Sequence, residues 1–132
     1  MKSHSRMPKL TKPELQIMEA LWAHGTLSIR EIQQSLPARG RPAYTTVQTV
    51  VYRLETKKAV RRAKKISNAH IFEAAISRSA AHRSLVSNFL EMFGGRTEPL
   101  IATLIDTGRL TLEEIQEAER TLRERPKRGR SI

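Results

Sequence analysis

The stretch AYTTVQTVVYRLETKK, residues 43–58, decides the expected fold. Its aliphatic side chains recur at helical spacing and form one apolar stripe: Val47, Val50, Val51 and Leu54. The opposite face carries hydroxyls, an amide and a guanidinium, but no carboxylate before Glu55. An ordinary solvated helix face mixes Glu with Lys. The pattern therefore predicts a helix whose exposed face suits a negatively charged partner.

The charge of the whole chain indicates the same kind of partner. The 132 residues carry a formal net charge of +11. Residues 1–76 hold 14 Lys and Arg against 5 Asp and Glu, whereas residues 77–124 hold 6 against 8. A basic N-terminal region followed by a nearly neutral C-terminal region is typical of proteins that bind polyanions. Charge alone leaves DNA, RNA and an anionic membrane surface open.

Several classes of protein are poorly supported. The chain has no Cys, which excludes disulfides, thiolate metal sites and Cys nucleophiles and agrees with a cytoplasmic location. No signal-peptide core is visible, and no stretch approaches the roughly 20 apolar residues of a membrane span. With one Asp and no Ser/His/acid cluster or Gly-rich phosphate loop, we expect no enzyme and no catalytic residues. His70 and His82 stand alone, so we expect no metal and no cofactor.

Three helix starts follow one pattern, the capping box, in which Thr or Ser is followed three residues later by Glu. With the opening stretch, these boxes predict helices over residues 12–23, 29–36, 43–57 and 112–124. Two extended runs, residues 60–66 and 70–74, flank Ser67-Asn68-Ala69 and predict a β-hairpin. Apolar stripes that end near glycines predict two more helices, over residues 78–93 and 98–106.

The order helix, helix, helix, hairpin over residues 10–76 is that of a winged helix-turn-helix. We therefore expect a mainly α protein with a small β-hairpin. The winged domain would follow a flexible N-terminus, residues 1–9, and precede a three-helix domain, residues 77–124. A basic flexible tail would occupy residues 125–132.

In this fold the third helix lies in the major groove, with its first turns at the base edges, and the wing contacts phosphates. Gln48 has the amide geometry that reads adenine, Arg53 suits guanine or phosphate, and Thr methyls can pack on thymine. A solvated charge run stays an alternative for any single basic residue of the wing. The candidate DNA-binding residues are Tyr44, Thr45, Thr46, Gln48, Thr49, Arg53, Lys57, Arg61, Arg62, Lys64, Lys65 and Asn68.

The segments LTKPELQIMEALWAHGTLSIREI, AYTTVQTVVYRLETKK and FLEMFGG resemble the penicillinase repressor (BlaI/MecI) family, which also includes copper-transport repressors. The resemblance covers residues 10–122. It implies a homodimeric repressor of transcription whose winged domains bind an inverted-repeat operator, commonly with TACA and TGTA half-sites. In many members a membrane sensor protease cuts the repressor within its dimerisation domain.

The resemblance also implies that the last three helices form the dimer interface. Their apolar stripes agree, because three helices are too few to hide so much apolar surface alone. The candidate dimerisation residues are Leu85, Phe89, Met92, Phe93, Leu100, Ile101, Leu104, Ile105, Ile115 and Leu122.

The chain departs from the family pattern in several places, among them the wing turn, which often carries Gly or Arg and is Ser67-Asn68-Ala69 here. Ala59 stands where the family usually has Gly after the third helix. Without Cys the chain lacks the metal site of the copper branch. The Asn-Phe dipeptide found in members that a protease cuts is missing near Thr103-Leu104. Control by a protease is therefore an open hypothesis.

Two other functions stay open at this stage. A non-specific nucleic-acid or RNA-binding protein would carry the same charge, but such proteins usually stack bases on exposed aromatic residues. Only 5% of this chain is aromatic. A winged-helix module that binds another protein would not need a basic wing, and its binding would depend less steeply on salt.

Overall fold

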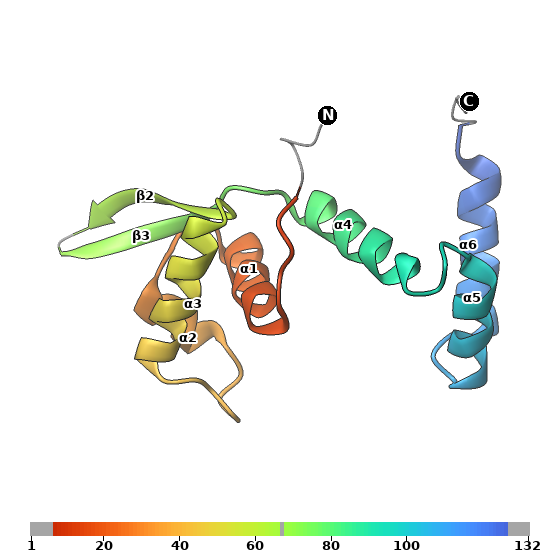
Figure 1. Ribbon diagram of the computed structural model, residues 1–132, viewed down its shortest axis with the longest axis horizontal. Helices are drawn as coiled ribbons and strands as arrows, with labels where there is room; N and C mark the ends of the chain where they lie inside the picture. The colour runs from red at the N-terminus through yellow and green to blue at the C-terminus, as the bar shows by residue number, and fades with distance from the viewer. Residues whose placement is uncertain (1–6, 67, 127–132) are drawn as a thin grey trace. The chain divides into compact units, whose positions relative to one another are not determined.

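The computed structural model describes residues 7–66 and 68–126 of the chain. The predicted N-terminus and tail therefore lie largely outside the described residues. Figure 1 shows the elements in chain order: α1 (Lys12–His24), β1 (Leu27–Ser28), α2 (Ile29–Ser35), α3 (Tyr44–Thr56), β2 (Val60–Ile66), β3 (Ala69–Ala74), α4 (Arg78–Glu91), α5 (Thr97–Asp106) and α6 (Leu112–Glu124). The chain divides into two compact units, residues 1–87 and 88–132.

The predicted helices and the hairpin are present, which confirms a mainly α fold with a small β element. The three predicted capping boxes are confirmed as well. In each box the side chain of Thr11, Ser28 or Thr111 accepts from the backbone of the Glu three residues on, and that Glu accepts in return. These boundaries were predictable because a capping box is satisfied within four consecutive residues.

The sheet has one strand more than the sequence predicted. Strand β1 pairs with β3, so the antiparallel order is β1-β3-β2. Ala69, expected in the turn, is the first residue of β3. A strand of two residues has no local periodicity, and its partner lies more than 40 positions along the chain, so no pattern in residues 27–28 could reveal it. The β2–β3 hairpin projects beyond the helices of its unit as a wing (Figure 1).

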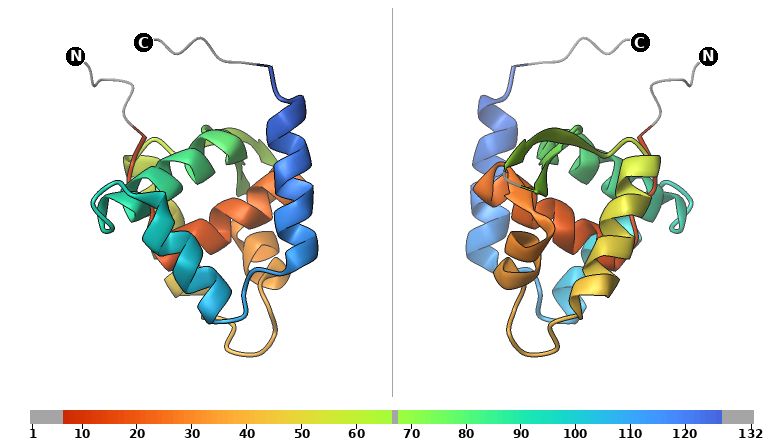
Figure 2. Two further views of the ribbon diagram at one scale, coloured as in Figure 1. Left: turned by 90° about the vertical axis from the view of Figure 1, so that its right-hand side faces the viewer. Right: turned by 90° about the vertical axis from the view of Figure 1, so that its left-hand side faces the viewer.

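The core of the first unit lies between α1, α2, α3 and the sheet. The predicted stripe of α3 is fully buried, and Phe72 at the middle of β3 has no exposed surface. On α1, Ile17 is buried while Leu15, expected on the apolar face, is half-buried. With its inner face fixed in the core, α3 lies at the surface of the unit (Figure 2, right, yellow).

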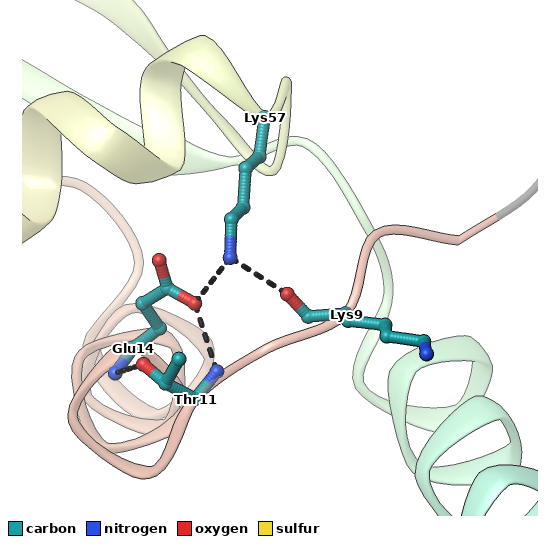
Figure 3. A network of polar contacts seen from close by, with 4 residues as sticks. All are labelled: Lys9, Thr11, Glu14 and Lys57. Carbon is teal, nitrogen blue, oxygen red and sulfur yellow. Dashed lines mark hydrogen bonds and ion pairs between the residues drawn. The ribbon is translucent and has the colours of Figure 1, made fainter.

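The least expected core residue is Glu14, whose side chain has no exposed surface. Its Oε1 accepts from the backbone N–H of Thr11 at 2.8 Å and from Lys57 Nζ at 2.7 Å. Lys57 Nζ also donates to the carbonyl oxygen of Lys9 at 2.7 Å (Figure 3). The second oxygen, Oε2, finds no partner among the described residues. One carboxylate therefore closes the start of α1 and ties it to the end of α3.

The polar contacts outweigh the cost of burial in setting the charge of Glu14. Burial acts to raise the pKa of this carboxyl, but the hydrogen bonds from Lys57 and Thr11 and the charge of Lys57 lower it below its ordinary value of 4.5. A carboxyl whose pKa is lower in the folded state stabilises the fold at neutral pH. That stabilisation is fully present above the ordinary pKa and is lost as the pH falls through the folded-state pKa.

Removing either partner of this pair should destabilise the first unit. We expect Lys57→Met to reduce the free energy of unfolding by about 3 kcal/mol, because it leaves a buried charge without a counter-ion. Glu14→Gln should cost less, since the amide oxygen still accepts and the partly exposed Lys57 can reach water. Chemical denaturation at pH 7 measures both, with the exposed Lys12→Met as the control. The deficit of Glu14→Gln should shrink below pH 4.5, and a deficit independent of pH would contradict this account.

Helix α3 ends in a Schellman motif. The N–H of Ala59 donates to the carbonyl of Leu54 at 2.9 Å, and the N–H of Lys58 donates to that of Glu55 at 3.0 Å. Lys58 holds the left-handed conformation that the motif requires, with φ of 66°. Ala59, the position where the family pattern has Gly, is fully buried. The residue that holds the left-handed conformation at the end of α3 is therefore Lys58, and not Ala59.

Lys58→Gly should stabilise the protein by about 0.5–1 kcal/mol. Gly removes a left-handed strain of roughly 1–2 kcal/mol, offset in part by the larger entropy of Gly in the unfolded chain. The matched control is Lys58→Ala, which removes the same charge and keeps a Cβ. Thermal unfolding should show a higher midpoint for Lys58→Gly alone, and an equal rise in both variants would mean that charge, not backbone strain, is responsible.

The second unit contains the end of α4 followed by α5 and α6. Gly94, with φ of 69°, ends α4, and Gly108, with φ of 74°, ends α5. Neither α5 nor α6 contains a buried side chain within the described residues. The large exposed apolar side chains of α4, α5, α6 and the turn after α4 are Val86, Phe89, Met92, Ile101, Ile105, Leu112, Ile115 and Leu122. Within the described residues, this part of the chain thus presents exposed apolar surface.

Candidate nucleic-acid interface

The first turn of α3 is free of negative charge and carries no side-chain cap. Its N-cap is Ala43, which makes no side-chain hydrogen bond, and the turn contains no acidic residue. Thr45 and Thr46 are exposed there. Backbone N–H groups at a helix start attract anions, and short side chains let a partner approach the backbone closely. This end of α3 is therefore suited to a phosphate backbone and to base edges.

Farther along α3 the polar side chains are partly oriented by one another. Gln48 Nε2 donates to the hydroxyl of Tyr52 at 3.2 Å. Thr49 is exposed, and its Oγ1 donates to the carbonyl of Thr45 at 3.0 Å, which leaves that oxygen free to accept a hydrogen bond. Arg53 follows in the last turn, exposed. The face thus offers an amide, a guanidinium and methyl groups, the side-chain groups that read base edges.

A cleft of about 360 Å³ separates α3 from the wing and reaches the start of α2. Its polar lining is made of hydroxyl, amide, imidazole and guanidinium groups, without a carboxylate. The guanidinium of Arg30 lies 5.6 Å from the ring centre of Tyr44, a cation–π contact that holds the charge at this cleft. The lining residues are Ser28, Ile29, Arg30, Tyr44, Gln48, Tyr52, Asn68, Ala69, His70 and Phe72.

The basic residues of the wing differ in how far they are engaged. Arg61 Nε lies 2.6 Å from Glu73 Oε2 across the β2–β3 pair. Arg62 Nε lies 2.8 Å from Glu55 Oε2, and its guanidinium also lies over the rings of Tyr52 and Phe72.

The remaining basic residues of the wing, Lys64 and Lys65, are exposed and form no ion pair within the described part of the chain. They are thus the wing residues most available to phosphates.

The Arg62–Glu55 pair shifts both groups toward their charged forms. The hydrogen bond from Arg62 lowers the pKa of Glu55, and the same bond raises the pKa of Arg62. The carboxylate of Glu55, the first acid along α3, is thereby neutralised by its neighbour. It adds little repulsion toward a polyanion.

The structure gathers most of the predicted DNA-binding residues and sets one apart. Tyr44, Gln48 and Asn68 line the same cleft, and the threonines of α3 lie on the exposed face beside it. Lys57 is different, because its ammonium donates to Glu14 and to the carbonyl oxygen of Lys9. The structure gives Lys57 a structural role, and its contact with DNA stays a prediction.

Sequence reasoning missed two side chains of the cleft that carry or can carry positive charge, Arg30 and His70. Arg30 lies in the first turn of α2, and only the packing of α2 against α3 brings it over Tyr44. A basic residue on the exposed side of a predicted helix gives no local signal of such a contact. His70 was considered only as a metal ligand, and the described residues contain no group of three His, Asp or Glu placed to hold a metal ion.

The comparisons with known proteins identify the family of the chain. The family model for penicillinase repressors matches residues 10–124. The chain belongs to the penicillinase repressor family. This confirms the resemblance that the sequence segments indicated, and it makes the protein a DNA-binding regulator of transcription of the repressor type. No helix in the described residues is long and apolar enough to cross a membrane.

Individual relatives of the penicillinase repressor family are distant. The penicillinase repressor of Bacillus licheniformis is 24% identical over 124 residues, which covers 93% of this chain and 96% of the relative. A solution structure of the DNA-binding domain of the repressor BlaI is 24% identical, with a TM-score of 0.49, over 56% of this chain and 89% of that one. A solution structure of the monomeric form of Bacillus licheniformis BlaI in complex with the blaP half-operator is also 24% identical. Its TM-score is 0.48, over 56% of this chain and 89% of that one.

Arg30→Ala should weaken DNA binding equally on all sequences. Arg30 is expected to neutralise one backbone phosphate, so its loss should reduce the slope of log K against log salt by about one. Fluorescence anisotropy on labelled duplexes between 50 and 200 mM salt would measure the slope, with Arg83→Ala of α4 as the control of equal charge. An unchanged slope, or a loss confined to one sequence, would contradict the phosphate contact.

Proposed function

We propose that this chain represses transcription as a homodimer bound to an inverted-repeat operator. Each protomer would place α3 in the major groove of one half-site, and the bound dimer would cover the promoter. The observation that carries this proposal is the face of α3, free of uncompensated carboxylates and bordered by a cleft lined with hydrogen-bonding groups. A polyanion of regular width is the partner that such a face fits.

The cleft between α3 and the wing suits one sugar–phosphate strand of the duplex. A helix in the major groove and a wing over the neighbouring groove must lie on either side of that strand. Arg30, Tyr44 and His70 would then contact phosphates from inside the cleft, while Lys64 and Lys65 would contact them from the wing. Thr45, Thr46, Gln48, Thr49 and Arg53 are left to face the bases.

Apolar surface in the second unit supports the homodimer. Met92 is 79% exposed and Leu122 is 68% exposed, values unusual for large apolar side chains unless a partner covers them. Two half-sites related by a two-fold axis require two copies of the same chain, and the two recognition helices would lie about one DNA turn, roughly 34–36 Å, apart. A second copy of this unit is therefore the partner proposed for the predicted dimerisation residues.

Inactivation by a membrane sensor protease is a separate hypothesis, motivated only by the family. It requires cleavage within the second unit. A purified repressor that stays uncut when incubated with the candidate protease would remove it.

The proposal is tested by titrating the protein on two duplexes at two salt concentrations. One duplex carries inverted TACA and TGTA half-sites, and the other is its base-shuffled copy. We expect tight binding of two chains to the first alone. Thr46→Ala or Arg53→Ala should weaken that binding by about 1–3 kcal/mol, as for a base-reading contact, with little change on the shuffled duplex.

Thr121→Ala and Arg83→Ala are the matched controls, because they remove the same types of side chain at exposed positions outside α3 and the wing. Equal, salt-sensitive binding of the wild-type protein to both duplexes would instead favour a non-specific nucleic-acid-binding protein. Equal losses on both duplexes in the two variants would show that these side chains do not read bases.

A further inference from the structure

Four side chains join the start of α4 to α1 within the first unit. Glu19 and Trp22 lie one turn apart on α1, and Arg78 and His82 lie one turn apart on α4. We call these four residues the α1–α4 latch. None of them belongs to the DNA-facing cleft or to the predicted dimerisation residues, so the proposed function does not account for them.

The carboxylate of Glu19 binds both residues of α4. Its Oε1 lies 3.3 Å from Arg78 Nη2, and its Oε2 lies 3.0 Å from His82 Nε2. One side chain of α1 thus holds two successive turns of α4. Since both carboxylate oxygens are used, rotation or sliding of α4 along α1 would break at least one of these contacts.

Trp22 contacts the same two residues. The guanidinium of Arg78 lies 5.7 Å from the indole ring centre, and the imidazole of His82 meets the ring edge-on with centroids 5.9 Å apart. The indole N–H donates to the carbonyl of Ile76, just before α4, at 2.9 Å. The connection into α4 is therefore fixed at the backbone as well as at two side chains.

Little else holds this part of α4. Ala81 is the one buried side chain of the helix within the described residues. Ser77 caps its start, accepting from the N–H of Ala80 at 3.1 Å, which defines where the helix begins but not its direction. An exposed ion pair alone contributes little to stability, yet here several contacts act on the same two turns. The direction of α4 on the winged unit therefore depends on the latch.

We propose that the α1–α4 latch sets the direction in which α4 leaves the winged domain, and so selects the distance between operator half-sites. This inference rests on the proposed homodimer. Helix α4 leads from each DNA-reading unit toward the proposed dimer contacts, so a fixed exit allows only certain separations of the two α3 helices. One added base pair moves a half-site by about 3.4 Å and turns it by roughly 35°. A dimer in which the latch fixes α4 should bind poorly when the half-site spacing changes, whereas a dimer without the latch should tolerate the change.

The test varies the spacing of the DNA and the latch together. Full-length wild type, Glu19→Gln and Trp22→Phe are titrated on duplexes whose inverted TACA and TGTA half-sites are separated by the best spacing and by one or two base pairs more or less. A duplex with a single half-site measures reading by one unit. Glu98→Gln is the control, since it removes an equal charge from an exposed ion pair with Arg96 in the second unit.

We expect the wild type to bind the best spacing at least tenfold more tightly than a spacing changed by two base pairs. Glu19→Gln and Trp22→Phe should reduce that preference to about threefold or less, with single half-site affinity unchanged. Glu98→Gln should keep the wild-type preference. An unchanged preference in both latch variants would overturn the inference, as would an equal loss of affinity on all duplexes, which would indicate damage to the reading unit.

Failure of the proposed function gives a different result. Wild-type protein that binds the shuffled duplex as tightly as the inverted repeat would overturn the proposed function, and the latch inference with it. A DNA-free measurement also probes the latch, because Trp22 is the single Trp of the chain. Its emission should move to longer wavelength in Glu19→Gln but not in Glu98→Gln. If Glu19→Gln leaves the emission unchanged, Glu19 does not hold the α1–α4 latch together.

Discussion

The ion pair between the buried Glu14 and the partly exposed Lys57 is the contact on which the DNA-binding unit depends. It joins the first turn of α1 to the residue that follows α3, and through Lys9 it includes the segment before α1. A charge with no exposed surface is tolerated only with a close counter-ion and further hydrogen bonds, so this geometry has few alternatives. Together with the apolar stripe of α3, the pair fixes the recognition helix from its inner side and at its end, and leaves the outer face for a partner.

The other carboxylates of the basic N-terminal region, residues 1–76, are also bound within the protein. Residues 1–76 contain five acids, and each has an internal partner: Glu14 binds Lys57, Glu19 binds Arg78 and His82, Glu31 caps α2, Glu55 binds Arg62 and Glu73 binds Arg61. Within the described residues, the basic side chains left without an acidic partner near α3 include Arg30 at the cleft and Lys64 and Lys65 on the wing. The interface follows as much from where the carboxylates are bound as from where Lys and Arg lie.

The roles of residues that contact distant parts of the chain could not be predicted from the sequence. Glu14 was predicted only as a capping residue, a role that its hydrogen bonds with Thr11 confirm, but its burial and its bond to Lys57 join positions 43 residues apart. Lys57 looked like one more basic residue at the end of a recognition helix. Arg30 gave no signal, because its place over Tyr44 depends on how α2 packs against α3. In each case the sequence shows the residue, but it does not show which distant residue its side chain contacts.

The sequence by itself determined the helices, the hairpin and the mainly α class, since helical periodicity, capping boxes and glycine stops act over a few residues. It also determined the family, through segments that the family model matches over residues 10–124. Only the tertiary structure decided the third strand, the pairing of the buried Glu14 with Lys57, the lining of the cleft and the α1–α4 latch. The physical reason is that these features consist of contacts between residues far apart in the chain, whose energies depend on burial and on distances that local patterns do not specify.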